Sequence, residues 1–213
     1  MKLIDGIKSL KGTPARIPEN SRDDLVELFN ELGYKVGAEV GVYKGHFTKL
    51  FCAGGLKMYA IDPWMTFGGQ QRGQEDMDRQ EFLYRHTNDV LRKWMGVGLC
   101  EIIRKTSAEA VKDFQPGELD FVYIDGDHSF SHIAHDIHEW SKVVRKGGIV
   151  SGHDYYNTRV NARTICHVGV VVDAYTRLCG IDNWWTFGWP STTEDAESRR
   201  LSLSWMWFKT WSG

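Results

Sequence analysis

Short apolar segments alternate with helix-like segments up to Ser151, and this alternation constrains the fold more than any other feature. Each apolar segment has the length and composition of a buried strand, and residues that favour turns follow most of them. The segments are 35–42, 57–61, 100–104, 119–124 and 149–151. Strands that alternate with helices form a parallel sheet with helices on both faces. The sequence therefore predicts a doubly wound α/β fold.

The C-terminal part departs from this alternation. A predicted helix over about 163–178 is followed by two strand-like runs, 184–187 and 201–208, with no helix between them. Two such strands most simply add an antiparallel strand at one edge of the sheet. The length suits one core, so we expect a single domain, 1–213. Its parts are a lead-in and helix (1–35), a cofactor-binding core (36–156) and a C-terminal helix and strand pair (157–213).

Composition excludes several classes of protein. The chain is 42% hydrophobic and 25% charged, with a net charge of −2, which is typical of a soluble globular protein. This charge gives no general attraction to nucleic acid or anionic membrane, and no apolar run approaches the ~20 residues of a membrane span. The N-terminus lacks the apolar block of a signal peptide, and the four cysteines are scattered without a Cys-x-x-Cys pair. We expect a cytoplasmic protein with reduced thiols and no nucleic-acid or membrane partner.

Candidate functional residues follow the predicted strands. Ligands of an open parallel sheet bind beyond the carboxyl ends of its strands, where the strand order reverses. The residues at these places include acids, imidazoles and glycines: 39–45, 62–64, 106–108, 125–128 and 153–155. Each group alone suits an ordinary turn. Their occurrence after successive strands favours a functional site along one edge of the sheet.

The turn after the first predicted strand limits the kind of ligand. Gly41 and Gly45 allow the backbone to approach a ligand closely. Asp62 lies 21 residues after Gly41, close to the ~20-residue separation at which an acid reaches a nucleotide ribose. Tyr43 replaces the second glycine of the Gly-x-Gly-x-x-Gly turn, and Glu39 would repel a pyrophosphate. The turn therefore favours a nucleoside cofactor without phosphates.

Four motifs in order then resemble class I S-adenosylmethionine-dependent methyltransferases, over roughly residues 36–156. They are Glu39-x-Gly41-x-x-x-Gly45, Ile61-Asp62-Pro63-Trp64, Tyr123-Ile124-Asp125-Gly126-Asp127-His128, and Lys146-Gly147-Gly148 followed by Gly152-His153-Asp154-Tyr155. Within this family the chain most resembles the small-molecule O-methyltransferases that include the catechol and macrolide-sugar enzymes. The resemblance implies a Rossmann-like sheet, mostly parallel with an antiparallel last strand. It also implies S-adenosylmethionine as cofactor and a small-molecule hydroxyl as acceptor.

The resemblance implies roles for individual residues. The methionine moiety of the cofactor would be held by Glu39, Gly41 and Gly45, with Tyr43 and Thr48 nearby. The remaining cofactor contacts would be Asp62 on the ribose hydroxyls, Trp64, Ser107 and Ala108 beside the adenine, and Asp125.

Metal-dependent relatives bind a divalent ion through an acid after the fourth strand and two adjacent residues after the fifth. The matching positions are Asp125, His153 and Asp154. His153 stands where those relatives usually carry an acid, which widens the candidates from Mg²⁺ to Mn²⁺, Fe²⁺ or Zn²⁺. His128 stands at the place of their basic residue, so we predict that it acts with Asp125 in catalysis, as a base that titrates near neutrality. The alternative for His128 is a turn residue before a helix.

Two other functions remain open from the sequence. One is an NAD-dependent oxidoreductase of Rossmann fold, and the other is a non-catalytic nucleoside-binding domain. For an enzyme, we expect walls of the acceptor site from 64–73, Tyr155, Tyr156, Trp184, Trp185 and Trp189. Most of the nine tryptophans would instead belong to the sheet core or to a homodimer surface, and His135 and His138 to the solvated face of a helix.

Overall fold

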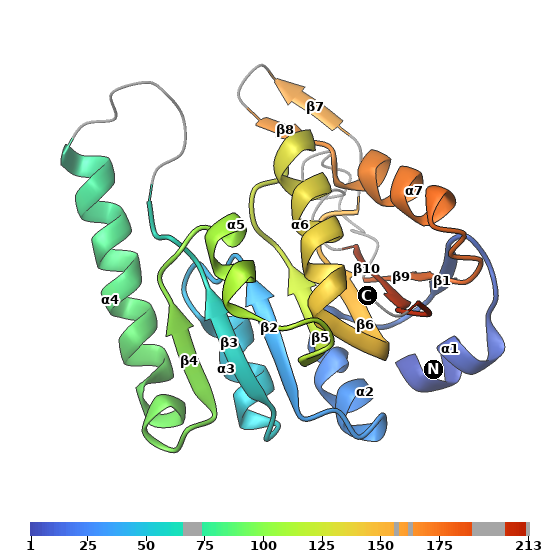
Figure 1. Cartoon of the computed structure of the whole chain (residues 1–213), viewed down its shortest axis with the longest axis horizontal. Coiled ribbons are helices and arrows are strands. Elements are labelled where there is room, and N and C mark those ends of the chain that lie inside the picture. Colours follow the sequence, from blue (N-terminus) through green and yellow to red (C-terminus); the bar gives the residue numbers. More distant parts are fainter. Residues whose placement is uncertain (66–73, 156–157, 162–163, 189–202, 212–213) are drawn as a thin grey trace.

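The predicted doubly wound sheet is present in the computed structural model, which describes residues 1–65, 74–155, 158–161, 164–188 and 203–211. The sheet has eight strands in the order β1-β9-β10-β6-β5-β2-β3-β4 (Figure 1). The central parallel strands are β2 (Val36–Val40), β3 (Lys57–Ile61), β4 (Cys100–Ile103), β5 (Leu119–Ile124) and β6 (Val144–Gly152). The chain runs outward from β2 to β4 and returns to β5, so the strand order reverses between β2 and β5.

The other side of the sheet corrects one expectation. The last strand, β10 (Ser204–Phe208), is antiparallel to both its neighbours, as predicted, but it does not lie at the edge. It is inserted between β6 and β9 (Trp185–Phe187), and β1 (Ala15–Ile17) extends the sheet by pairing with β9 in parallel. The predicted helix over 163–178 is also shorter. It begins at Val168, after a hairpin of β7 (Thr158–Asn161) and β8 (Thr164–Cys166).

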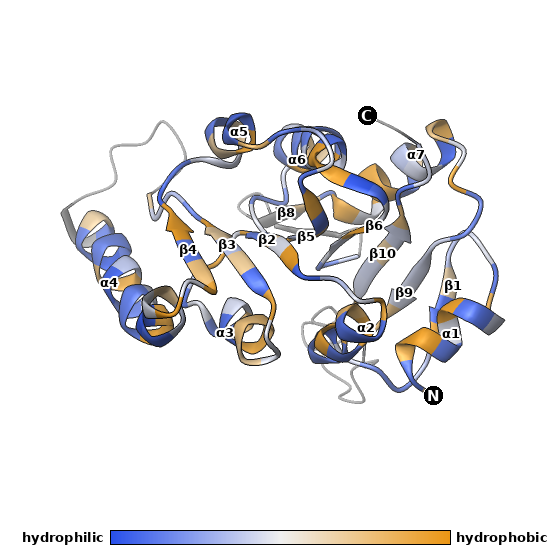
Figure 2. Cartoon of the chain, turned by 60° about the horizontal axis from the view of Figure 1, so that its bottom comes forward, coloured by the Kyte–Doolittle hydropathy of each residue, from blue (hydrophilic) through white to orange (hydrophobic). Residues whose placement is uncertain are grey.

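Helices cover both faces of the sheet (Figure 2). One face carries α1 (Leu3–Ser9), the 3-10 helix η1 (Arg22–Asp24), α2 (Leu25–Glu31), α3 (His46–Ala53) and α4 (Gln74–Gly96). The other carries α5 (Ser107–Ala110), the 3-10 helix η2 (Val111–Asp113), α6 (Phe130–Val143) and α7 (Val168–Leu178). No helix in the described ranges is both long enough and apolar enough to cross a membrane.

Each face of the sheet has its own apolar core, and β5 shows how one strand serves both. Phe121 and Tyr123 pack with Phe29 and Phe51 from α2 and α3. Val122 and Ile124 point to the opposite face and join the cluster that contains Trp140 from α6. Successive side chains of a strand point to opposite faces, so an almost continuously apolar segment is required where both faces are covered. Burial on both sides fixes β5 at the centre of the molecule.

Candidate active site

The carboxyl ends of the parallel strands β2, β3 and β5 border a cavity of about 520 Å³. This volume is within the range of small-molecule sites, about 300–1,000 Å³. The predicted residues that line it are Gly41, Tyr43, Asp62, Ser107, Ala108 and Asp125. The cavity lies where the strand order reverses, as expected for a ligand site of an open α/β sheet.

A second cavity of about 270 Å³ adjoins the first, since both are lined by Gly41, Tyr43 and Asp125. Glu39 lines this smaller cavity, as do Arg22 and His46, which the sequence analysis did not propose. Arg22 belongs to the N-terminal segment, where no motif indicated a function. A two-part cavity with Asp125 at the junction suits a ligand with two chemically different ends.

Gly41 is required first by the protein backbone. Its φ is +92°, and a Cβ atom at this position would lie 2.2 Å from the carbonyl oxygen of Asp125. The loops after β2 and β5 therefore touch at Gly41, which brings Asp125 to the edge of the larger cavity. Tyr43 follows with a φ of +53°, an uncommon conformation for a residue other than glycine.

The contact at Gly41 gives a testable prediction. We expect Gly41→Ala to lower the free energy of unfolding by about 2–5 kcal/mol, because a left-handed backbone costs about 1–2 kcal/mol and an overpacked contact about 1–3 kcal/mol. Gly55→Ala is the matched control, since Gly55 has a φ of +86° and nothing within 4 Å of the added Cβ. Denaturant unfolding of both variants measures the difference. Equal losses in the two variants would contradict the proposed loop contact.

Asp62 holds the turn in shape. One of its oxygens accepts hydrogen bonds from the backbone N–H groups of Val42 (3.0 Å) and Tyr43 (2.9 Å), and the other accepts from Trp64 N–H (2.7 Å). Burial raises the pKa of Asp62 although these N–H groups oppose the shift. Asp62 lines the cavity, while Trp64 packs in the core and donates its ring N–H to the carbonyl of Tyr43. The structure therefore places Trp64 behind the turn. This differs from the prediction, which put Trp64 on the wall of the cavity.

Glu39 is an acid buried at the end of β2. Its side chain is 2% exposed, and the Thr48 hydroxyl donates a hydrogen bond to its carboxylate. Burial raises the pKa of Glu39 to about 8, because removal from water disfavours the charged form. The Thr48 hydroxyl and the Arg22 guanidinium oppose this shift. A ligand cation in the smaller cavity would supply the positive charge that ionised Glu39 needs.

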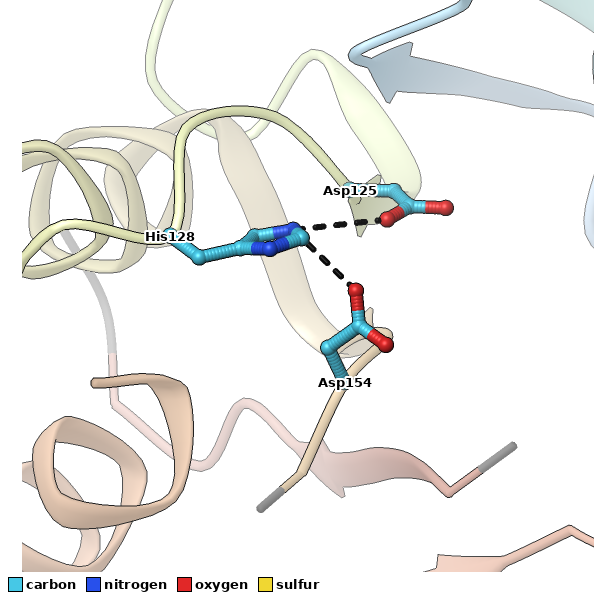
Figure 3. A group of neighbouring side chains, drawn as sticks. All are labelled: Asp125, His128 and Asp154. Carbon is cyan, nitrogen blue, oxygen red and sulfur yellow. Dashed lines mark ion pairs between the residues drawn. The ribbon is translucent and has the colours of Figure 1, made fainter. Parts of the chain in front are cut away.

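Asp125, His128 and Asp154 converge beside the junction of the two cavities (Figure 3). His128 Nε2 lies 3.6 Å from Asp125 Oδ1 and 3.3 Å from Asp154 Oδ2. This nitrogen is buried, and within the described part of the chain it has no hydrogen-bond partner of good geometry. Burial lowers the pKa of His128, but the two carboxylates outweigh it and the net direction is upward. The arrangement suits either a proton or a metal ion between the carboxylates and the imidazole.

Backbone contacts bring the members of this cluster together. Asp125 N–H donates to the carbonyl of Val40 (2.7 Å), which ties the end of β5 to β2. The loop before α6 carries His128, whose carbonyl accepts from the N–H of His167 (2.9 Å). Asp154 has a φ of +53°, so its backbone turns sharply after β6. The loops after two strands, β5 and β6, thus supply one cluster.

His153 lies at the side of the cluster. Its Nδ1 is 3.1 Å from Asp154 Oδ1 and 4.0 Å from Asp125 Oδ1. The three residues whose ligand atoms all lie within 4.8 Å of one another are Asp125, His128 and Asp154. The sequence predicted His153 as the third metal ligand beside Asp125 and Asp154. In the structure, His128 can take that place.

A hydrogen-bonded group that includes Ser107 and Asp136 forms part of the wall of the larger cavity. Ser107 donates to the carboxylate of Asp136, and the ring N–H of Trp140 donates to the Ser107 hydroxyl (2.8 Å). Burial raises the pKa of Asp136 to about 6. His132 and His135 also line this cavity, so His135 does not lie simply on a solvated face as predicted. No sequence motif indicated Asp136, which lies within α6.

The predicted acceptor walls are only partly within the described residues. Tyr156, Trp189 and the loop 66–73 lie outside them. Trp184 and Trp185 are buried in the two cores, and Trp185 donates its ring N–H to the carbonyl of Leu10 (2.9 Å). Tyr155 donates a hydrogen bond to Asp173 (2.7 Å). These contacts assign the two tryptophans to packing.

An open α/β sheet with such a cavity at its switch point is typical of proteins that bind a nucleoside-containing cofactor. The sequence profile of a methyltransferase-domain family matches residues 38–155, more than half of the chain, and the chain belongs to this family. The match runs from β2 to the residues just after β6. This segment carries the residues that line both cavities and the Asp125–His128–Asp154 cluster.

Comparison with individual proteins gives one relative in sequence and two in fold. The chain is 25% identical over 122 residues to the uncharacterized protein y4gI of Sinorhizobium fredii; the alignment covers 54% of this chain and 12% of that protein, so the chain spans only a small part of its length. Two solved structures share the fold. An O-methyltransferase from Bacillus cereus in complex with SAH has a TM-score of 0.58 and 12% identity, over 90% of this chain and 83% of that one. TomG from Streptomyces achromogenes, an O-methyltransferase of tomaymycin synthesis in complex with SAM, has a TM-score of 0.61 and 11% identity. The alignment covers 88% of this chain and 78% of TomG.

Proposed function

We propose that this protein transfers the methyl group of S-adenosylmethionine to a hydroxyl oxygen of a small molecule. The observation that carries the proposal is the two-part cavity with Asp125 at its junction. The larger part has the size and the acidic residue, Asp62, that a nucleoside needs. The smaller part has a buried acid, Glu39, suited to the ammonium of an amino acid. The donor's sulfonium would then lie near Asp125.

The proposed reaction needs positioning and proton removal. The acceptor oxygen attacks the methyl carbon as the carbon–sulfur bond breaks, which leaves S-adenosylhomocysteine and a proton from the hydroxyl. His128 takes this proton, and the carboxylates of Asp125 and Asp154 orient the imidazole and stabilise its charged form. Fixed dipoles and charges in this partly buried site favour the transition state in which the donor loses its positive charge.

The cluster also fits a divalent cation. Ligand atoms around Mn²⁺, Fe²⁺ or Zn²⁺ lie about 3 Å apart, because each is about 2.0–2.2 Å from the ion. The 3.3 and 3.6 Å separations and the unbonded Nε2 of His128 suit such an ion. Asp125, His128 and Asp154 would hold it, with His153 beside them. When bound, the cation would lower the pKa of the acceptor hydroxyl, and His128 would then serve as a ligand of the ion in place of its role as the base.

Calorimetric titration with S-adenosylhomocysteine, S-adenosylmethionine and NAD tests the proposal. We expect the first two to bind and NAD not to bind, because Glu39 and Tyr43 leave no turn for a pyrophosphate. Binding of NAD alone would reject the methyltransferase proposal in favour of an oxidoreductase. Donor binding without transfer to any of a panel of catechols and sugars would favour the non-catalytic alternative.

A further inference from the structure

Arg22 brings a positive charge from the N-terminal segment into the smaller cavity. Its Nη1 lies 3.2 Å from Asp125 Oδ2, and its guanidinium lies 5.0 Å from the centre of the Phe47 ring. The side chain is 40% exposed, so one part of it is packed and another faces the cavity and solvent. Among the described residues, Asp125 is the one carboxylate within 4.0 Å of the guanidinium. A planar guanidinium can pair with a second carboxylate through its remaining N–H groups.

We propose that Arg22 binds the α-carboxylate of the methyl donor's amino-acid end, and so selects donors that carry this group. The inference rests on the proposed function. The smaller cavity is lined by one buried acid, Glu39, and by the Arg22 guanidinium. An α-amino acid carries an ammonium and a carboxylate on one carbon, so a neighbouring acid and guanidinium match its two charges. Arg22 is therefore a specificity-determining residue, and it touches the proton-transfer cluster through its ion pair with Asp125.

The other basic side chains at this cavity are less suited to the role. Lys44 Nζ lies 5.2 Å from the centre of the Tyr43 ring, which directs its charge over that ring. His46 is exposed and its ring is stacked with that of His86, 6.1 Å between centres. Arg22 is positioned by the Asp125 contact and the Phe47 ring together. Less conformational freedom is lost when such a held side chain binds a ligand.

The test compares ligands that differ at the amino-acid end. S-Adenosylhomocysteine carries both charges, its decarboxylated analogue keeps the amine alone, and 5′-methylthioadenosine has neither. We expect the wild-type protein to bind S-adenosylhomocysteine about 10- to 100-fold more tightly than the decarboxylated analogue, as measured by calorimetry. This comparison needs no variant, so it holds even if substitutions at Arg22 affect folding.

Arg22→Met then identifies the residue responsible. We expect this substitution to weaken the binding of S-adenosylhomocysteine about 10- to 100-fold. The affinities for the decarboxylated analogue and 5′-methylthioadenosine should stay within about twofold of those of the wild type. Arg145→Met is the matched control. Arg145 also pairs with a carboxylate, Asp120, and lies 5.1 Å from an aromatic ring, that of Tyr34, with a similar side-chain exposure of 42%. It lies outside both cavities, and its substitution should change no affinity.

Three results would overturn the inference. Equal weakening of all three ligands by Arg22→Met would mean that Arg22 acts through the shape of the site. Unchanged binding of S-adenosylhomocysteine would assign the carboxylate to other groups. Equal wild-type affinity for S-adenosylhomocysteine and its decarboxylated analogue would show that the carboxylate is not recognised, while the proposed function would stand. If the wild-type protein bound none of the three ligands, the proposed function itself would fail.

Discussion

Glu39→Gln is expected to weaken the binding of S-adenosylhomocysteine about 10- to 100-fold, since a hydrogen bond to a charged group is worth roughly 1.5–3 kcal/mol. Glutamine has nearly the same size as glutamate and can still accept the hydrogen bond from Thr48. The variant therefore removes the negative charge that would meet the ammonium of the ligand, with little change in packing.

Glu39 also predicts how the affinity changes with pH. In the free protein its pKa is raised to about 8, so at pH 7 the carboxyl group is largely protonated. The bound ligand requires the carboxylate, so binding should release close to one proton at pH 7. Raising the pH removes the proton that binding must displace, and the affinity should rise by up to tenfold per pH unit below pH 8 and level off above it.

Calorimetric titrations at pH 7 in two buffers of different ionisation enthalpy measure this proton release directly. Glu39→Gln should abolish it. Glu101→Gln, at an exposed position on β4, is the control and should release as many protons as wild type. Unchanged proton release in Glu39→Gln would assign the titration to another group and would remove Glu39 from the ammonium site.

His128→Gln is the second large effect that we expect. Methyl transfer should fall by about 10²–10⁴-fold, the usual contribution of a general acid or base, while the affinity for S-adenosylhomocysteine stays within about threefold. The reason is that His128 belongs to the Asp125–His128–Asp154 cluster and does not line either cavity. Transfer is measured with labelled S-adenosylmethionine and the panel of catechols and sugars. His138→Gln, on an exposed face of α6, the helix that follows His128, should retain activity.

The same variant tests metal binding without any acceptor. We expect the chelator-treated protein to bind Mn²⁺ or Zn²⁺ in a titration, and His128→Gln to weaken this binding by at least about tenfold. His153→Gln should have the smaller effect, because His153 lies beside the ligand set. Full activity in the presence of a chelator would contradict the proposed metal site and leave His128 as the base. A larger loss from His153→Gln would restore the ligand set that the sequence predicts.

The alternation of strands and helices could be predicted because it depends on local patterns. Apolar runs such as 119–124 need burial on both faces, and glycine or aspartate ends them. The short strand β1 is different, whereas β9 lies within the strand-like run predicted at 184–187. Ala15–Ile17 has no distinctive pattern and becomes a strand because its backbone groups pair with Trp185–Phe187. The position of β10 inside the sheet follows from the same long-range pairing.

The sequence by itself determined the parallel core, the edge that carries the site, and the acids at that edge, because turn residues and strand lengths are local properties. The tertiary structure decided which of these side chains face one another. Arg22 and Asp125 are 103 positions apart, and no spacing rule could join them. The same holds for Trp64. Its backbone φ of +43° and the hydrogen bond from its ring N–H to the carbonyl of Tyr43 place it behind the turn. Side-chain direction depends on the path of the whole backbone, and it separates the residues that can touch a ligand from those that support them.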